Sequence, residues 1–242
     1  MKKRRLLGVG LAFLFFSLVA VGIWFYVWLF HDLPHPQDIS NYVAIQEDAR
    51  QHIPVSLQDI TDDLQWATLS VLDPQFYARP AEIRLWGVMR GVWHTLTMEN
   101  WRGDGASLTE YLVLDLMSVS DERVSDFRRQ RMREMVLGVV ITQRYTKDEI
   151  LEMYLNSTSY GSGVYGVGTA AHYYFGKQVR ELSLAESAML VAICWMGEFD
   201  EAEDLERAVE LQEAVLELMT YQGCITEEEA WLAGEEVILF AR

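Results

Sequence analysis

The chain has 242 residues and a formal net charge of −16, from 20 basic and 36 acidic side chains. Half of the residues are hydrophobic, which excludes a disordered chain, and two cysteines are too few for a disulfide-stapled scaffold. So acidic a chain also argues against a nucleic-acid-binding protein, because a phosphate backbone needs a positive footprint. Cys194 and Cys224 allow one disulfide at most, and free thiols are the simpler interpretation.

The N-terminal segment predicts a membrane anchor. Residues 1–5 form a basic tail, and residues 6–30 are an uninterrupted uncharged, largely apolar run. As a helix this run extends about 37 Å, enough to cross a bilayer core of about 30 Å. A cleaved signal peptide is the alternative, but residues 23–30 stay apolar and aromatic after a possible cleavage site. The basic tail should remain cytoplasmic, so we expect a single-pass protein of the inner (plasma) membrane with an extracytoplasmic domain.

The rest of the chain predicts a short linker and one helical domain. Residues 31–52 are polar and proline-containing, which is typical of a linker. No stretch rich in Pro, Gly or Ser divides residues 53–242, so we expect a single all-α domain there. Residues 122–144 show helical apolar periodicity. Capping-box sequences, in which Ser or Thr precedes Glu by three residues, predict three further helix starts: Thr146, Ser183 and Thr226.

A series of motifs then points to a known family. Residues 144–156 read RYTKDEILEMYLN and residues 160–177 read YGSGVYGVGTAAHYYFGK. With IPVSLQDITDDLQWA, VLDPQFY and GASLTEYLVLD upstream and LSLAESAML downstream, they resemble the family-51 glycosyltransferases, the peptidoglycan polymerases that occur alone or within class A penicillin-binding proteins. The ordered series covers nearly all of residues 53–235, so it is far more specific than one motif. The resemblance implies a lysozyme-like helical domain with a cleft for lipid-linked disaccharide.

The first family motif lacks its catalytic acid here. The family reaction joins two lipid-linked sugars, and a carboxylate base removes the proton of the attacking hydroxyl. That base is the Glu of the motif E-D-x-x-F, whereas the matching segment reads LDPQF, with Leu72 at the base position. A leucine cannot accept a proton. Asp73 remains as a candidate base, although neighbouring helical residues point about 100° apart.

The second family motif, G-G-S-T-I-T-Q-Q-L-A-K-N, matches residues 104–115, which read DGASLTEYLVLD. Glu110 and Tyr111 replace the paired glutamines, and Leu114 replaces the lysine. A cation and a neutral donor are therefore lost, and a carboxylate stands where the resemblance implies pyrophosphate oxygens. Like charges are unfavourable there unless a metal ion intervenes. The substrate-binding candidates on this segment are Ser107, Thr109 and Glu110.

The third family motif, R-K-x-x-E, matches residues 130–134, which read QRMRE. The resemblance implies that Glu134 lies near the pyrophosphate and a divalent ion, so Glu134 is a candidate catalytic and metal-binding residue, with Mg²⁺ or Mn²⁺ as the cofactor. Arg131 is then a substrate-binding cation. The alternative is an i, i+3 ion pair between these two side chains that only supports the helix. Lys147, from the fourth motif, completes the substrate-binding candidates.

Three functional hypotheses follow, all within cell-wall assembly at the membrane surface. In the first, the protein is a peptidoglycan glycosyltransferase in which Glu134 or Asp73 has taken over part of the base role. In the second, it is a non-catalytic protein that binds lipid-linked precursor or a glycan strand, or that scaffolds an active cell-wall synthase. The third, a lysozyme-like hydrolase, needs the same two carboxylates about 5 to 9.5 Å apart, and ranks last. Loss of a general base costs about 100- to 10,000-fold in rate, so we expect weak or lost polymerisation.

Overall fold

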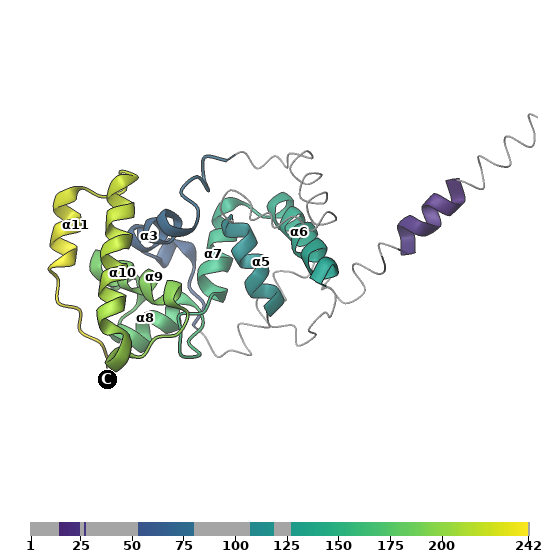
Figure 1. The fold of residues 1–242 in the computed structure, drawn as a ribbon. Helices are drawn as coiled ribbons and strands as arrows, with labels where there is room; N and C mark the ends of the chain where they lie inside the picture. Colours follow the sequence, from purple (N-terminus) through teal and green to yellow (C-terminus); the bar gives the residue numbers. More distant parts are fainter. Residues whose placement is uncertain (1–14, 25–26, 28–52, 80–106, 119–126, 242) are drawn as a thin grey trace, which may run out of the picture.

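The computed structural model describes residues 15–24, 27, 53–79, 107–118 and 127–241 (Figure 1). Within these ranges the chain forms helices and no strand, apart from one isolated bridge between Ser159 and Tyr165. The all-α class predicted from the sequence is therefore confirmed for the described residues. The α-helices are α3 (Asp62–Leu72), α5 (Leu108–Ser118), α6 (Phe127–Arg144), α7 (Lys147–Ser157), α8 (Val167–Phe175), α9 (Leu184–Met196), α10 (Glu201–Tyr221) and α11 (Glu227–Gly234), with short 3₁₀ helices at Leu57–Asp59 and Val179–Glu181.

The predicted capping boxes form at all three helix starts. Thr146 Oγ1 accepts a hydrogen bond from Glu149 N at 3.3 Å, and the Glu149 carboxylate accepts one from Thr146 N at 2.7 Å. The same reciprocal pairs begin α9 at Ser183 and α11 at Thr226. Each box satisfies backbone N–H groups that the first helical turn leaves without a partner. Local sequence therefore decides where these helices begin.

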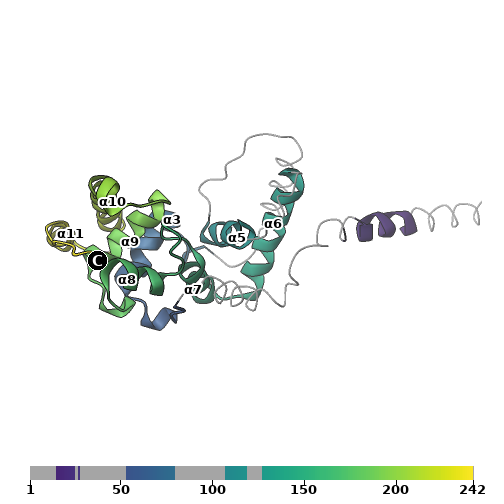
Figure 2. The same ribbon diagram turned by 90° about the horizontal axis from the view of Figure 1, so that it is seen from below.

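Helix α9 is the centre of the larger group of helices. Every residue from Ala185 to Ile193 is buried, as expected for a helix that is apolar on all sides. It packs against α3, α8, α10 and α11, and Figure 2 shows it between α3 and α8 with α10 across it. Helix α5 packs instead against α6 and α7, on the other side of the molecule. Helix α7 therefore joins the group around α9 to the pair α5 and α6.

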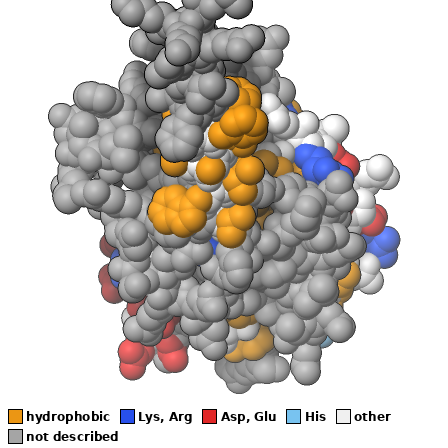
Figure 3. Space-filling model, turned by 90° about the vertical axis from the view of Figure 1, so that its right-hand side faces the viewer, with side chains coloured by type: hydrophobic (Ala, Val, Ile, Leu, Met, Phe, Trp, Pro, Cys, Tyr) orange, Lys and Arg blue, Asp and Glu red, His pale blue; other side chains and the backbone are white. Residues whose placement is uncertain are grey.

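The face on the α6 side of the molecule carries an apolar area. Figure 3 shows hydrophobic side chains gathered near its centre, with acidic side chains towards the lower edge. Residues 15–24 are helical and lie beyond this side in Figure 1. Across the described ranges, no helix has both the length and the apolar character needed to cross a membrane. Most of the anchor predicted over residues 6–30, and all of the linker predicted over residues 31–52, lie outside the described residues.

Residues 53–57 are held against α7 and α8 by side chains that bond their backbone. Asn156 on α7 accepts from Val55 N at 2.9 Å and donates to Val55 O at 2.8 Å. Leu57 N donates to the Glu152 carboxylate at 2.7 Å, and Ile53 N donates to Thr169 Oγ1 at 2.9 Å. This segment, the start of the predicted domain, is thus bound like a peptide along two helices.

Two glycines inside helices should respond in opposite ways to alanine. A Cβ at Gly168 would lie 2.3 Å from the carbonyl oxygen of Ile53 and 2.7 Å from Val55 Cγ2, so Gly168→Ala must displace the bound segment. We expect it to lower the free energy of unfolding by about 1–3 kcal/mol. At Gly138 the nearest neighbour is Val113 Cγ2 at 3.9 Å, so Gly138→Ala should raise the free energy of unfolding by about 0.5–1 kcal/mol through helix propensity. Urea unfolding followed by circular dichroism measures both, and equal effects would contradict the close approach.

Candidate functional site

Helix α3 ends at the position where the resemblance places the catalytic base. Leu72 is the last residue of α3 and is half-buried, and it packs at the edge of the hydrophobic core. Asp73 follows it as the C-cap, with its backbone N–H donating to Leu69 O at 2.9 Å. The end of α3 therefore presents an alkyl side chain at the base position, and an alkyl side chain accepts no proton.

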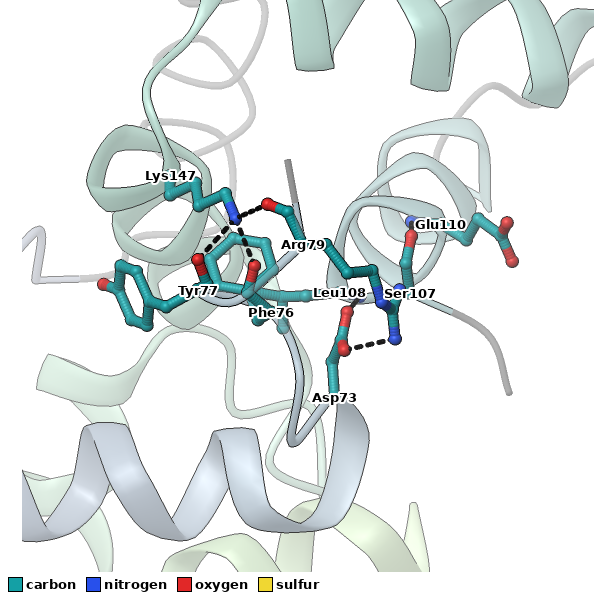
Figure 4. Close-up of polar contacts among 8 residues, drawn as sticks. All are labelled: Asp73, Phe76, Tyr77, Arg79, Ser107, Leu108, Glu110 and Lys147. Atoms are coloured by element: carbon teal, nitrogen blue, oxygen red, sulfur yellow. Dashed lines mark hydrogen bonds and ion pairs between the residues drawn. The ribbon is translucent and has the colours of Figure 1, made fainter. Parts of the chain in front are cut away.

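The Asp73 carboxylate joins two separate segments. Its side chain is 1% exposed, and Oδ1 accepts from Arg79 Nη2 at 2.6 Å (Figure 4). Oδ2 accepts from the backbone N–H of Leu108, the first residue of α5, at 3.1 Å. An anion at a helix N-terminus is favoured by the helix dipole as well as by this bond. Both carboxylate oxygens thus hold α5 and the turn after α3 together, and the catalytic role of Asp73 stays a prediction.

Lys147, at the start of α7, binds the backbone of the turn that follows α3. Its ammonium donates to the carbonyl oxygens of Phe76, Tyr77 and Arg79, with the Tyr77 bond at 3.0 Å (Figure 4). The Nζ atom also lies 5.5 Å from the centre of the Phe76 ring. Burial lowers the pKa of the Lys147 ammonium, an effect that Asp73 opposes and Arg79 reinforces. This cation is therefore bonded to backbone, and its substrate-binding role stays a prediction.

Tyr77 provides a further link between the turn and α7. Its hydroxyl donates to Asp148 Oδ1 at 2.9 Å, and its ring lies 6.2 Å from that of Trp66 on α3. Burial raises the pKa of Tyr77, and the hydrogen bond to Asp148 raises it further, because the phenolate would be desolvated beside a carboxylate. The hydroxyl keeps its proton at neutral pH and acts as a hydrogen-bond donor.

The candidates of the second motif occupy different positions around the first turn of α5. Ser107 precedes the helix, and its Oγ accepts from Glu110 N at 3.4 Å. Thr109 is buried, whereas Glu110 is exposed and points away from Asp73 in Figure 4. Leu114, one turn after Glu110, is 42% exposed. The residue types that replace the family's glutamine and lysine are therefore the ones at the surface of α5.

The third motif lies within α6. Glu134 is half-buried there and Arg133 is buried. The side chain of Arg131 lies outside what the structure describes, so the ion-pair alternative for Arg131 and Glu134 stays open. The base role of Glu134, and the separation between Asp73 and Glu134 that a hydrolase would need, stay predictions.

A metal site needs several ligand side chains close together. Among the described residues, no three or more His, Cys, Asp or Glu side chains cluster closely enough to hold a metal ion. Hard ions such as Mg²⁺ and Mn²⁺ favour several oxygen ligands. The Mg²⁺ or Mn²⁺ ion stays a prediction from the resemblance.

Both cysteines are free thiols. Burial raises the pKa of the Cys194 thiol to about 11, although hydrogen bonds from Thr158 and Tyr154 oppose the shift. The reactive form of cysteine is the thiolate, so this side chain is a packing residue rather than a nucleophile.

The structure assigns parts of the site to residues that the motifs alone left without a role. Arg79, which follows the first motif, forms the ion pair with Asp73. Asn156, the last residue of the segment RYTKDEILEMYLN, holds the backbone of Val55 through two hydrogen bonds. An arginine six residues after an aspartate, across a proline-containing turn, is the sequence feature that could have predicted the ion pair.

Comparisons with known proteins agree with the motifs. A model of the family described as Transglycosylase matches residues 38–220, starting inside the segment predicted as a linker. Penicillin-binding protein 1F of Bacillus subtilis (strain 168) is 31% identical over 73% of this chain and 24% of its own length. Penicillin-binding protein 1A of Rickettsia conorii is 28% identical over 95% of this chain and 31% of its own length, and that of Escherichia coli K12 is 32% identical over 74% and 21%.

The chain thus spans between about a fifth and a third of the length of these relatives. Among solved structures, penicillin-binding protein 1A from Haemophilus influenzae is similar, with a TM-score of 0.46 and 23% identity over 79% of this chain and 18% of that chain. The family model covers far more than half of the sequence, and the motif series predicts the same family. The chain belongs to the transglycosylase family.

Proposed function

We propose that this protein is a membrane-anchored, extracytoplasmic member of the transglycosylase family that binds the glycan substrates of cell-wall assembly and polymerises them weakly or not at all. The substrates are lipid-linked disaccharide precursor or a glycan strand. The observation that carries the proposal is the end of α3, where Leu72 takes the base position and both oxygens of Asp73 are bonded to protein.

Proton removal is the first step that this geometry disfavours. A general base must lie within hydrogen-bond reach of the attacking hydroxyl and be able to accept its proton. Leu72 offers no acceptor atom. Protonation of Asp73 would break its ion pair with Arg79 and weaken its bond to Leu108 N, so the carboxylate is a poor substitute. Without another base, the rate should fall by about 100- to 10,000-fold.

Departure of the pyrophosphate is the second step that is disfavoured. The leaving group needs cations or amide donors directed at its growing charge. Arg79 already pairs with Asp73, and Lys147 already bonds three carbonyl oxygens. Exposed Glu110 adds a negative charge on α5. Together these contacts favour a protein that holds its ligand over one that transfers it.

The membrane location in the proposal rests on the sequence. The apolar run of residues 6–30 suits a single-pass anchor, and the basic residues 2–5 place the N-terminus in the cytoplasm. A lipid-linked sugar lies at the same membrane surface, so an anchored domain would meet it without diffusing through bulk solvent.

Scaffolding of an active cell-wall synthase is a second candidate role. It is favoured by large hydrophobic side chains that stay exposed on α10 and α11: Leu205, Val209, Trp231 and Leu232. Exposed apolar surface of this kind commonly marks a protein contact. Co-purification with an active synthase, lost when Trp231 and Leu232 are both changed to serine, would support this role.

A polymerisation assay tests the main proposal. The purified chain is incubated with fluorescent lipid-linked disaccharide precursor and Mg²⁺, beside an active member of the family. We expect few or no glycan chains from the wild type and from Leu72→Glu, because Arg79 and Lys147 would still be bonded to the protein itself. Leu72→Gln is the matched variant that restores size and polarity without basicity. Polymerisation by the wild type at a rate close to that of the active family member, or robust polymerisation by Leu72→Glu alone, would overturn the proposal.

A further inference from the structure

The segment that follows α11, residues 236–241, lies on the surface of the domain as an extended stretch. Figure 1 shows it in yellow, leading from α11 to the C-terminus. Its side chains alternate: Ile238 and Phe240 pack against the hydrophobic core, whereas Val237 and Leu239 are 80% and 76% exposed. A period of two is that of a β-strand. The segment is therefore strand-like, although the described residues contain no sheet for it to join.

Both ends of this segment are bonded to the domain. At one end the Glu236 carboxylate accepts a hydrogen bond from Ser183 Oγ at 2.7 Å. At the other end Ala241 N donates to Tyr174 O at 2.7 Å, and the Phe240 ring packs against three other aromatic rings. The segment is thus held in place, and its outward side chains belong to a defined surface.

The backbone between these two attachments is unpaired. Within the described parts of the chain, no group forms a hydrogen bond with the N–H or C=O groups of residues 237–240. An extended segment with unpaired backbone groups is a template for a further strand, which would bond along its edge. Apolar side chains of such a strand would also cover Val237 and Leu239, because side chains on one face of paired strands lie beside each other.

The charge around the segment indicates what kind of strand fits. Residues 208–241 contain eight glutamates and no Lys, Arg or His. Glu235, directly before the segment, is exposed. Pairing of two copies of this chain along the segment would bring their carboxylates together, whereas a basic strand would meet opposite charge. The charge therefore favours a basic segment of another protein over a second copy.

We infer that residues 236–241 bind an extended, basic segment of a partner protein by strand addition. The inference rests on the proposed scaffolding role and names the chemistry of the partner. Backbone hydrogen bonds to residues 237–240 hold the partner strand, its apolar side chains lie beside Val237 and Leu239, and its basic side chains neutralise the nearby glutamates.

Three labelled peptides test this pairing by fluorescence anisotropy with the full chain in detergent. The first is a short peptide of alternating valine and lysine, the second is the same peptide N-methylated at all backbone amides, and the third has glutamate in place of lysine. We expect the first to bind and the other two to bind at least about tenfold more weakly, because N-methylation removes the strand hydrogen bonds and glutamate reverses the charge. Added salt should weaken binding of the first peptide.

Hydrogen exchange separates strand pairing from simple attraction between opposite charges. In the free chain the amides of residues 237–240 should exchange fast, because they have no partner. The valine–lysine peptide should slow exchange about tenfold or more at alternate amides of this stretch, since one edge of a strand bonds every second residue. Attraction by charge alone would leave these rates unchanged.

A double variant tests the outward side chains. Val237→Ser with Leu239→Ser should weaken the valine–lysine peptide about tenfold, because the apolar contact is lost. Tyr221→Ser is the matched control: it removes a side chain that is also highly exposed, at the end of α10, and should leave the affinity unchanged. Thermal unfolding checks that both variants fold, and the peptide and exchange measurements on the wild type stand if the double variant does not.

The outcomes separate this inference from the proposed function. The inference fails if the valine–lysine peptide does not bind, binds without slowing exchange, or binds no better than its N-methylated form. A dimer of the wild type that the double variant abolishes would make a second copy the occupant and would also overturn it. None of these results changes the expected polymerisation, and the scaffolding role fails separately if no active synthase co-purifies with the chain.

Discussion

Replacement of Asp73 by alanine is expected to lower the free energy of unfolding by about 2–4 kcal/mol. The change removes the buried carboxylate that accepts from Arg79 and from Leu108 N, and it leaves the first N–H group of α5 buried without an acceptor. The Arg79 side chain is 44% exposed and can be hydrated in the variant, so most of the loss comes from the Leu108 N–H group at the start of α5. Guanidinium unfolding followed by circular dichroism measures the loss, and hydrogen exchange at the Leu108 amide localises it.

Asparagine at the same position distinguishes a structural from a catalytic carboxylate. Asp73→Asn keeps an oxygen for Leu108 N and loses only the ion pair, so we expect less than half of the effect of Asp73→Ala on stability. A general base would behave differently: any polymerisation would disappear in Asp73→Asn while stability stayed near that of the wild type. If Asp73→Ala were as stable as the wild type, the contacts of Asp73 with Arg79 and Leu108 N would not stabilise the fold.

Replacement of Asn156 by alanine should cost a similar amount, about 2–4 kcal/mol. The side chain is 4% exposed and bonds Val55 N, Val55 O and Glu152 O. Its loss leaves backbone groups of the bound segment without partners in a place that water reaches poorly. Urea unfolding gives the free energy, and limited proteolysis near residue 53 should show that the segment detaches before the helices unfold.

Thr169→Val is the graded control for the same segment. It removes a single bond, to the N–H of exposed Ile53, and should lower the free energy of unfolding by no more than about 0.5–1 kcal/mol. Proteolysis near residue 53 should rise only slightly. Equal losses in Asn156→Ala and Thr169→Val would mean that the segment is held by packing rather than by the two Val55 bonds.

The departures from the family motifs are unevenly distributed over this site. Contacts that hold the frame persist, such as Lys147 on the carbonyl oxygens of the turn and Asn156 on Val55. Groups that face outward have changed type, with a carboxylate at position 110 and a leucine at position 114. A buried polar group is costly to lose because its partners stay unsatisfied, whereas an exposed one is replaced at little cost to folding. Exposed positions can therefore depart from a family motif while the fold is kept.

The sequence by itself determined the family, the helical class and the absence of a carboxyl group at position 72. It also predicted the helix starts at Thr146, Ser183 and Thr226, because a capping box is closed within four residues and needs no other part of the chain. Motif order along the chain was sufficient for the family, since it depends on residue types and spacing alone.

Only the tertiary structure decided what the remaining polar groups do. In the sequence, Asp73 is only the acidic residue next to Leu72, whereas its hydrogen-bond partner Leu108 is 35 residues away. Lys147 bonds Tyr77 across 70 residues, and Asn156 bonds Val55 across 101. Periodicity and capping describe interactions within one or two turns, whereas these bonds depend on how α3, α5 and α7 pack. The same type of side chain can therefore serve as a base, as a ligand contact or as a structural hydrogen-bonding group, and the packing of the helices determines which of these contacts it makes.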